Sequence, residues 1–284
     1  MSRRRSVLQH QRQLQEIRDI MNAMKNLAYL ETRKIARYLA NQRAITVHIQ
    51  TVAKQLLHCF PELRSAATTS TSIIIATGAE HGFCGAFNDQ LIHAMTQILP
   101  GETRVAPSFI IIGYKLGQKL RDDARVAGLI EGASIAEEID SVLDRVVDKI
   151  ISLHREDRNF EIKAVFHDPD ALTVRVKHIF PPFMDIELDE SFPSGMPAMN
   201  LPPRELFREL ADQYLFAALY EIAYLSFMAE NQSRLEHLDQ ATNQIDNRLV
   251  ELKRRSNALR QEEIIEEIEV ILVNSTVASS QSWP

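Results

Sequence analysis

The chain has 284 residues, of which 45% are hydrophobic and 25% are charged, and its formal net charge at pH 7 is −6. This length is typical of about two domains, and the balance of apolar and charged residues excludes a wholly disordered chain. The negative charge argues against general nucleic-acid binding, and the basic start, Arg3 to Arg5, is expected to be a solvated tail.

The sequence also lacks the marks of membrane insertion and of secretion. No stretch approaches the roughly 18 apolar residues that are needed to span a bilayer, and the N-terminus has no apolar signal core. Cys59 and Cys84 match no metal or redox spacing, which favours a reducing compartment. We therefore expect no direct insertion into a membrane.

The N-terminal part of the chain carries a seven-residue repeat. From Ile17 the repeat positions follow in alternating steps of four and three, and only Glu31 and Gln42 are polar. Such spacing sets one seam along a helix, and a long seam must be buried against another helix. The helix is expected to continue to Phe60, where Pro61 stops it. The seam positions are Ile17, Met21, Met24, Ala28, Glu31, Ile35, Tyr38, Gln42, Ile45, Ile49, Val52 and Leu56.

The C-terminal part repeats this pattern. Beyond Pro203 there is no glycine, and no proline before the last residue, so the sequence predicts a helix on the order of 100 Å long. Because one helix leads into the central part and the other leads out of it, we expect the two to meet as an antiparallel coiled coil. The second seam consists of Leu235, Leu238, Thr242, Ile245, Leu249, Leu252, Ser256 and Leu259.

Between the two helices the pattern changes to that of an α/β domain. Short β-branched runs alternate with helical patterns, and the last two runs flank the turn Asp168-Pro-Asp170. This order predicts parallel crossovers followed by an antiparallel pair. The expected strands are 72–77, 109–113, 162–166 and 172–180, and the expected helices are one after Asn88 that ends at Pro100, 115–122 and 135–154. The fold class is therefore α/β, with a Rossmann-like domain at 67–203 and coiled-coil helices at 1–66 and 204–284.

The central domain shows no catalytic, cofactor or metal constellation. The loop Gly82–Asn88 could cradle a phosphate, but it lacks the spacing and the lysine of a P-loop, so a tight strand-to-helix turn is the preferred interpretation. His81 and Cys84 have no further metal ligands in the pattern, and Cys84 has no identifiable base. We expect neither an active site nor a bound cofactor or metal.

Three stretches carry a resemblance to a known family. Met21-Asn-Ala-Met-Lys25, the loop Gly82-Phe-Cys-Gly85 with Asn88, and a gapless stretch from Glu230 to Ala278 resemble the gamma subunit of the F-type ATP synthase. The resemblance covers essentially the whole chain. The matching C-terminal positions include Glu230, Asn231, Arg234, Ala241, Thr242, Leu252, Asn257, Arg260, Gln261, Ile264, Glu267, Ile268 and Ile271.

The resemblance implies a non-catalytic rotor, the central stalk that couples ion-driven rotation of a membrane ring to ATP synthesis or hydrolysis in other subunits. It implies the alpha/beta hexamer of the head, the epsilon subunit and the membrane c-ring as partners, and a peripheral place on the cytoplasmic face of a bacterial or archaeal plasma membrane. Arg33 and Lys34 match a basic pair that faces the catalytic subunit, and Arg260, Gln261 and Glu267 match a polar cluster near the tip. The full set of expected partner contacts is Met24, Lys25, Arg33, Lys34, Arg234, Arg260, Gln261 and Glu267.

Some positions depart from the family pattern. Ser256 replaces a usual tyrosine and Ile265 a usual threonine, and Tyr29 and Leu30 stand where small or basic residues are usual. These changes point to a divergent member of the family. An alternative or sodium-linked F-type complex is one candidate for the assembly to which such a member belongs. Two other interpretations stay open: a nucleotide-binding α/β enzyme with helical dimerisation arms, and a coiled-coil scaffold.

Overall fold

A computed structural model of the protein describes residues 3–64, 71–98, 107–153, 160–184 and 199–280. The chain divides into two compact units, one formed by residues 1–27 with 236–284 and the other by residues 28–235. The helices α1 (Arg3–Cys59) and α5 (Pro203–Ser280) contribute to both units. As predicted, α1 ends just before Pro61, and α5 continues without a break because no glycine or proline interrupts it.

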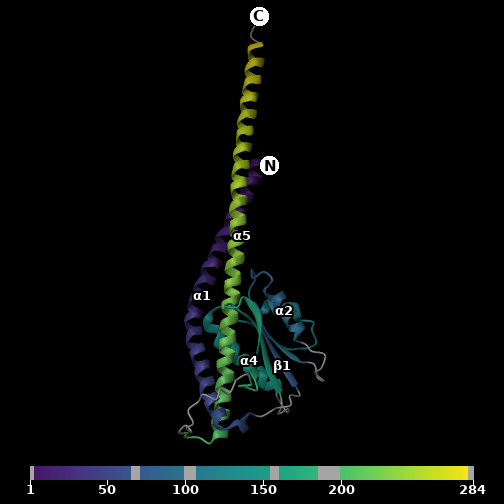
Figure 1. Ribbon diagram of the computed structural model, residues 1–284. Helices are drawn as coiled ribbons and strands as arrows, with labels where there is room; N and C mark the ends of the chain where they lie inside the picture. The colour runs from purple at the N-terminus through teal and green to yellow at the C-terminus, as the bar shows by residue number, and fades with distance from the viewer. Residues whose placement is uncertain (1–2, 65–70, 99–106, 154–159, 185–198, 281–284) are drawn as a thin grey trace. The chain divides into compact units, whose positions relative to one another are not determined.

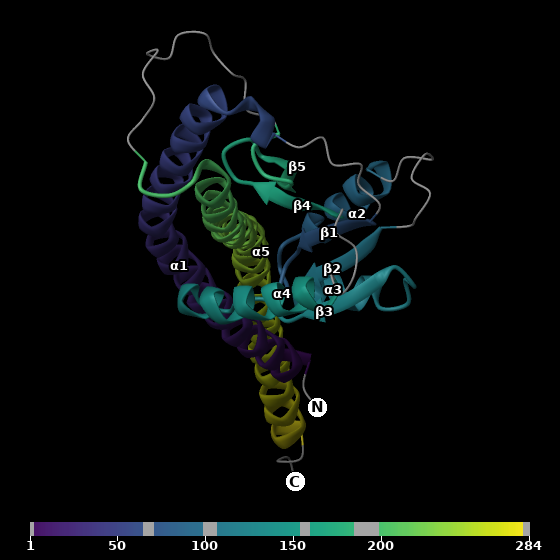
Figure 2. The same cartoon turned by 90° about the horizontal axis from the view of Figure 1, so that it is seen from below.

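The larger unit contains a five-stranded sheet in the order β3-β2-β1-β4-β5 (Figure 2). β3, β2, β1 and β4 run parallel to one another, and β5 runs antiparallel to β4. This confirms the predicted α/β class with its final antiparallel pair. The strands are β1 (Thr71–Thr77), β2 (Ser108–Ile112), β3 (Val126–Ile130), β4 (Phe160–Asp168) and β5 (Thr173–Phe180), and the connecting helices are α2 (Phe87–Gln97), α3 (Tyr114–Leu120), the 3-10 turn η2 (Ala136–Glu138) and α4 (Ile139–Leu153).

The strand β3 is the element that the sequence interpretation missed. Its five residues, Val-Ala-Gly-Leu-Ile, contain Gly128 and lie between two helical segments. A glycine weakens a strand signal, and five residues are too few to show a period.

Both faces of the central strands are covered, as is usual for a parallel sheet. Ile73 and Ile75 of β1 pack in a core with α1, α4 and α5, whereas Ile74 and Ala76 pack with α2 and α3 on the other face. Because successive strand residues point to opposite faces, a run of consecutive apolar residues serves both cores at once.

Along α1 the buried positions do not follow the predicted heptad for its whole length. Tyr38 and Ile45 were expected in the seam but are 42% and 50% exposed, so this part of the prediction is wrong. The predicted positions Ala28, Glu31, Ile35 and Leu56 are buried, but so are Leu39, Thr46, Ala53 and Leu57, which lie off the predicted seam. These positions keep the period of about 3.6 residues of a straight helix on a domain surface, rather than the 3.5 of a supercoiled pair.

In the smaller unit, α1 and α5 lie side by side and antiparallel (Figure 1). Arg4 pairs with Glu263 at 3.1 Å and Arg18 with Asp246 at 3.4 Å, so the residue number rises in one helix as it falls in the other. The predicted antiparallel arrangement is thus confirmed. The second seam is buried at Leu238, Thr242, Leu252 and Ser256. In the first seam Met21 is buried, but Ile17 is exposed, contrary to the prediction.

Candidate functional site

The loop between β1 and α2 is a tight turn built around Gly78 and Asn88. A Cβ atom on Gly78 would lie 2.4 Å from Cβ of Leu116, so only glycine fits there without displacement. The side-chain oxygen of Asn88 accepts a hydrogen bond from the backbone amide of Ala79 at 2.9 Å. Gly78 and the asparagine of the family pattern, Asn88, therefore shape the turn.

The next two amides of this loop are bound by a carboxylate of α5. Oε1 of Glu230 accepts hydrogen bonds from the backbone amides of Glu80, at 3.2 Å, and of His81, at 3.1 Å. Burial raises the pKa of Glu230, while Arg234 and the two amides act in the opposite direction. The consecutive amides of Ala79, Glu80 and His81 are thus all hydrogen-bonded to side chains of the protein.

Arg234 holds the same loop from one turn further along α5. Its Nε donates to the carbonyl oxygen of Gly82 at 3.2 Å, one Nη donates to Asn231 Oδ1 at 2.9 Å, and the other donates to the carboxylate of Glu230. The residue is only 6% exposed. Its expected contact with a partner stays a prediction, but its guanidinium already ties the loop to the helix.

Cys84 lies in this polar cluster as a buried thiol. Its Sγ is 3.6 Å from an Nη of Arg234, yet burial raises its pKa to about 11, against the opposing effect of the guanidinium. The group is therefore protonated at neutral pH, and a thiol is a poor nucleophile. The interpretation of Cys84 as a small buried residue agrees with this environment.

The two residues of the predicted basic pair on α1, Arg33 and Lys34, have different surroundings in the structure. Lys34 forms an ion pair with Glu137, which raises the pKa of Lys34, and lies 3.6 Å from Glu31. Arg33 is exposed, with its Cζ 5.8 Å from the ring centroid of Tyr29. In the described part of the chain Arg33 has no ion pair. Of the two cations, Arg33 is the one left available to a partner.

The remaining expected contacts lie in the smaller unit. Met24 is half-buried, and Lys25 pairs with Asp239, whose pKa that contact lowers. The polar side chains near the end of α5, those of Arg260, Gln261 and Glu267, are exposed. Their contact with a partner stays a prediction.

The end of α5 also carries apolar residues that the sequence interpretation did not count as a site. The Arg4–Glu263 pair marks the level at which α1 begins. Beyond it, large apolar side chains are exposed, with Ile271 at 66%. Their spacing over one to two helical turns was visible in the sequence and could have identified them. They are Ile264, Ile265, Ile268, Val270, Ile271 and Leu272.

Among the described residues, no group of three or more His, Cys, Asp or Glu side chains is arranged to hold a metal ion. In the same part of the chain, no helix is both long and apolar enough to cross a membrane.

The fold and these surfaces define a class of protein in which two long terminal helices pack, over part of their length, against one face of the sheet of a small α/β domain. A family model described as ATP synthase matches residues 4–274. The chain is 25% identical to the ATP synthase gamma chain of Caldanaerobacter subterraneus subsp. tengcongensis, covering 93% of this chain and 96% of the relative. It is 22% identical to the gamma chain of Symbiobacterium thermophilum, covering 95% and 96%.

The fold has a counterpart among solved structures. A chain in the central stalk and c-ring structure of the Tetrahymena thermophila mitochondrial ATP synthase aligns with a TM-score of 0.57 and 16% identity. The alignment covers 78% of this chain and 99% of that chain. The protein belongs to the ATP synthase gamma-chain family.

Proposed function

We propose that the protein is the central-stalk rotor subunit of an F-type ATP synthase. It couples ion-driven rotation of a membrane ring to ATP synthesis or hydrolysis in the catalytic subunits. The observation that carries this proposal is the family match over residues 4–274, together with the antiparallel α1–α5 pair in the smaller unit.

The mechanism we propose is mechanical and the subunit itself is not catalytic. An asymmetric shaft that turns inside the alpha/beta hexamer contacts each catalytic subunit in turn and favours a different conformation at each angle. Rotation then becomes a difference in nucleotide affinity between conformations. A shaft of this kind needs contacts that break easily, and exposed ion pairs are worth only about 0–1 kcal/mol each.

The loop amides argue against the alternative of a nucleotide-binding enzyme. An anion site at a helix start needs free backbone N–H groups. Here the amides of Ala79, Glu80 and His81 are already bonded to side chains of the protein. These three amides are therefore not free to bind a phosphate in this arrangement, and the high pKa of Cys84 removes the nearest nucleophile.

We assign the surfaces that contact partner subunits from the side chains that are exposed. We assign Arg33 to an acidic loop of the catalytic subunit, and Arg260, Gln261 and Glu267 to polar contacts in the head. The exposed apolar end of α5 is assigned to a surrounding apolar collar of the alpha/beta hexamer, since an apolar helix end in water is otherwise unfavourable. The epsilon subunit and the c-ring are the remaining partners.

In this proposal the protein is a peripheral subunit on the cytoplasmic face of a bacterial or archaeal plasma membrane. The departures at Tyr29, Leu30, Ser256 and Ile265 support a divergent member of the family, for which an alternative or sodium-linked complex is one candidate. The coupling ion itself is selected in the membrane ring and not by this chain.

The test is to purify the native complex through a tag on the full chain and to identify the subunits that accompany it. We expect alpha, beta, epsilon and c subunits together with ATPase activity, and none of that activity in the purified chain alone. Recovery of only a homo-oligomer would favour the coiled-coil scaffold. ATP hydrolysis by the isolated chain would contradict the non-catalytic role.

A further inference from the structure

A row of three tyrosine rings lies where α1 and α5 meet α4 in the unit formed by residues 28–235. The ring centroids of Tyr38 and Tyr224 are 6.0 Å apart, and those of Tyr224 and Tyr220 are also 6.0 Å apart. Tyr38 is 42% exposed, and the other two are half-buried. The faces of aromatic rings carry partial negative charge, so a row of rings that reaches the surface attracts cations.

Two carboxylates of α4 lie beside these rings. Burial raises the pKa of Tyr220, and so do the interaction with Asp140 and the charge of Asp144. Burial and the charge of Asp140 also raise the pKa of Tyr224. Asp140 lies in the first turn of α4, where the helix dipole favours an acidic residue, but Asp144 lies one turn further along. The dipole alone therefore does not account for both carboxylates.

The segment around these two carboxylates has an excess of negative charge. Residues 131–148 contain six acidic side chains and one basic side chain, that of Arg145, which donates to two backbone carbonyl oxygens of the segment. From α1, Lys34 pairs with Glu137, and Arg37 has no ion pair in the described residues. In the same part of the chain no ion pair neutralises the two carboxylates beside the rings. The six acidic residues are Glu131, Glu137, Glu138, Asp140, Asp144 and Asp148.

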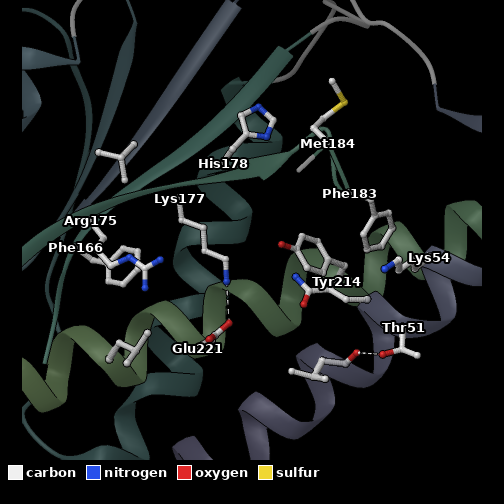
Figure 3. A pocket seen from close by; sticks show the side chains of 14 residues that line it. Thr51, Lys54, Phe166, Arg175, Lys177, His178, Phe183, Met184, Tyr214 and Glu221 are labelled. Atoms are coloured by element: carbon white, nitrogen blue, oxygen red, sulfur yellow. Dashed lines mark hydrogen bonds and ion pairs between the residues drawn. The ribbon is translucent and has the colours of Figure 1, made fainter. Parts of the chain in front are cut away.

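The residue that follows Tyr220 on α5 shows the contrast. The carboxylate of Glu221 pairs with Lys177 of β5 at 2.9 Å, in a groove of about 700 Å³ beside that strand (Figure 3). Arg175, which also lines this groove, pairs with Asp168 at 2.7 Å. The charges on that side of α5 are thus paired within the chain, whereas those beside the tyrosines are not.

We propose that Tyr38, Tyr220 and Tyr224, with Asp140 and Asp144, form a docking surface for an arginine of a partner protein. The guanidinium would lie on an exposed ring face, within about 6 Å of the ring centroid, and its N–H groups would reach the carboxylates. This chemistry favours arginine over lysine, because a planar guanidinium stacks on a ring and donates as a fork, whereas an ammonium is a strongly hydrated point charge. The surface is separate from the contacts proposed for Arg33 and for the end of α5.

The test uses the full chain with ring-labelled tyrosine, of which the sequence has six, and NMR as the readout. The peptide acetyl-Gly-Arg-Gly-Arg-Gly-amide should shift the signals of Tyr38, Tyr220 and Tyr224 in a saturable way and leave those of Tyr114 and Tyr214 unchanged. The matching Gly-Lys peptide should bind at least about threefold more weakly. Equal binding of the two peptides, or no shift of these three signals, would overturn the proposal.

Two variants separate the charges from the rings. Asp140→Asn/Asp144→Asn keeps the polar side chains but removes both charges, so the affinity for the Arg peptide should fall at least about tenfold. Tyr38→Leu keeps the charges and removes the exposed ring, so the preference for the Arg peptide over the Lys peptide should fall. Unchanged signals of Tyr114 and Tyr214 show that both variants are folded. An unchanged preference in Tyr38→Leu would overturn the role of the rings.

A matched control removes two charges elsewhere. Asp122, just after α3, and Asp212, more than two turns before Tyr220 on α5, are both exposed. Asp122→Asn/Asp212→Asn should leave the affinity for the Arg peptide unchanged, and an equal loss would mean that net charge alone drives binding. Displacement of the peptide by low-millimolar Ca²⁺ would assign the carboxylates to a metal ion instead. Either result would overturn the proposal.

A second measurement asks whether a partner covers the surface. A carbodiimide with a labelled amine should modify Asp140 and Asp144 several-fold less in the purified native complex than in the isolated chain. Equal modification in a complex that contains the alpha and beta subunits would overturn the docking of a partner there. The peptide measurements need no complex, so their failure is distinguishable from a failure of the proposed rotor function.

Discussion

The carboxylate of Glu31 accepts a hydrogen bond from the backbone amide of Ala136 at 2.9 Å, although Glu31 occupies a position where the N-terminal repeat calls for an apolar residue. Glu31 is buried on α1, and Ala136 begins the turn η2 that leads into α4. The Glu31 side chain thus accepts a hydrogen bond from a backbone amide at the start of η2, which has no partner within that turn.

Replacement of Glu31 should therefore destabilise the protein, even by an apolar residue that fits the repeat. Glu31→Leu leaves the amide of Ala136 buried and unpaired, which costs about 1–3 kcal/mol. Glu31→Gln keeps an acceptor and should cost less. Denaturant unfolding of both variants measures the difference. The exposed Glu16 of the same helix is the control, and Glu16→Gln should be neutral. A stability of Glu31→Leu equal to that of the parent would show that the bond contributes nothing.

The Glu230–Arg234 pair should show strong coupling. Arg234→Met leaves the buried carboxylate of Glu230 without its cation, and breaking a buried pair in this way costs about 3–5 kcal/mol. The double variant Glu230→Gln/Arg234→Met should be more stable than the sum of the single changes predicts. The exposed pair Arg248–Glu251 is the control, and Arg248→Met should change stability by about 1 kcal/mol or less. Strict additivity at Glu230 and Arg234 would refute the coupling.

His167 should make the central domain sensitive to mild acid. Burial lowers its pKa from the ordinary value near 6.5, against a hydrogen bond in which Nε2 donates to the carbonyl of Phe87 at 2.8 Å. The unfolded chain then binds the proton more readily, so the stabilising contribution is complete above pH 6.5 and is lost as the pH falls through the lower folded pKa. His167→Gln should reduce the drop in the thermal midpoint between pH 7.5 and pH 5. A drop as large as that of the parent would contradict this assignment.

Arg33 should matter more for coupling than Lys34. The ammonium of Lys34 already pairs with Glu137, whereas Arg33 is exposed without an ion pair in the described residues. Arg33→Ala should leave assembly and stability unchanged and lower coupled ATP synthesis in reconstituted complexes. Lys34→Ala should have a smaller effect on synthesis. The pair Arg260→Ala/Gln261→Ala is expected to matter less than Arg33→Ala, because Ile265 replaces a hydroxyl nearby. Normal synthesis by Arg33→Ala would remove Arg33 from the contact surface.

Much of the fold could be predicted because its determinants are local. The terminal helices follow from the absence of glycine and proline, and four of the five strands follow from short β-branched runs between helical patterns. The heptad failed at Tyr38 and Ile45 because the choice between 3.5 and 3.6 residues per turn depends on what lies opposite the helix, which the repeat alone does not contain. The division into domains at residues 66 and 203 stays a prediction.

The polar cluster was less accessible to sequence reasoning. Glu230 and Arg234 were matched to the family pattern, but their partners, Glu80, His81 and Gly82, lie about 150 residues away along the chain. Burial of a charged side chain is decided by such distant neighbours, and no local pattern reports it. For this reason the sequence predicted only a partner contact for Arg234 and did not show that its side chain is 6% exposed and bonded within the protein.

The side chain of Glu230 binds the backbone amides of Glu80 and His81, so the domain supplies its own acceptor at this point of the loop. An anion attached to the chain acts at a high effective concentration, which no free phosphate of ordinary affinity matches. Loss of that single side chain would leave two amides and a guanidinium pointing at one vacated position. The amides of Glu80 and His81 are therefore closed to a free phosphate by a side chain of the same molecule.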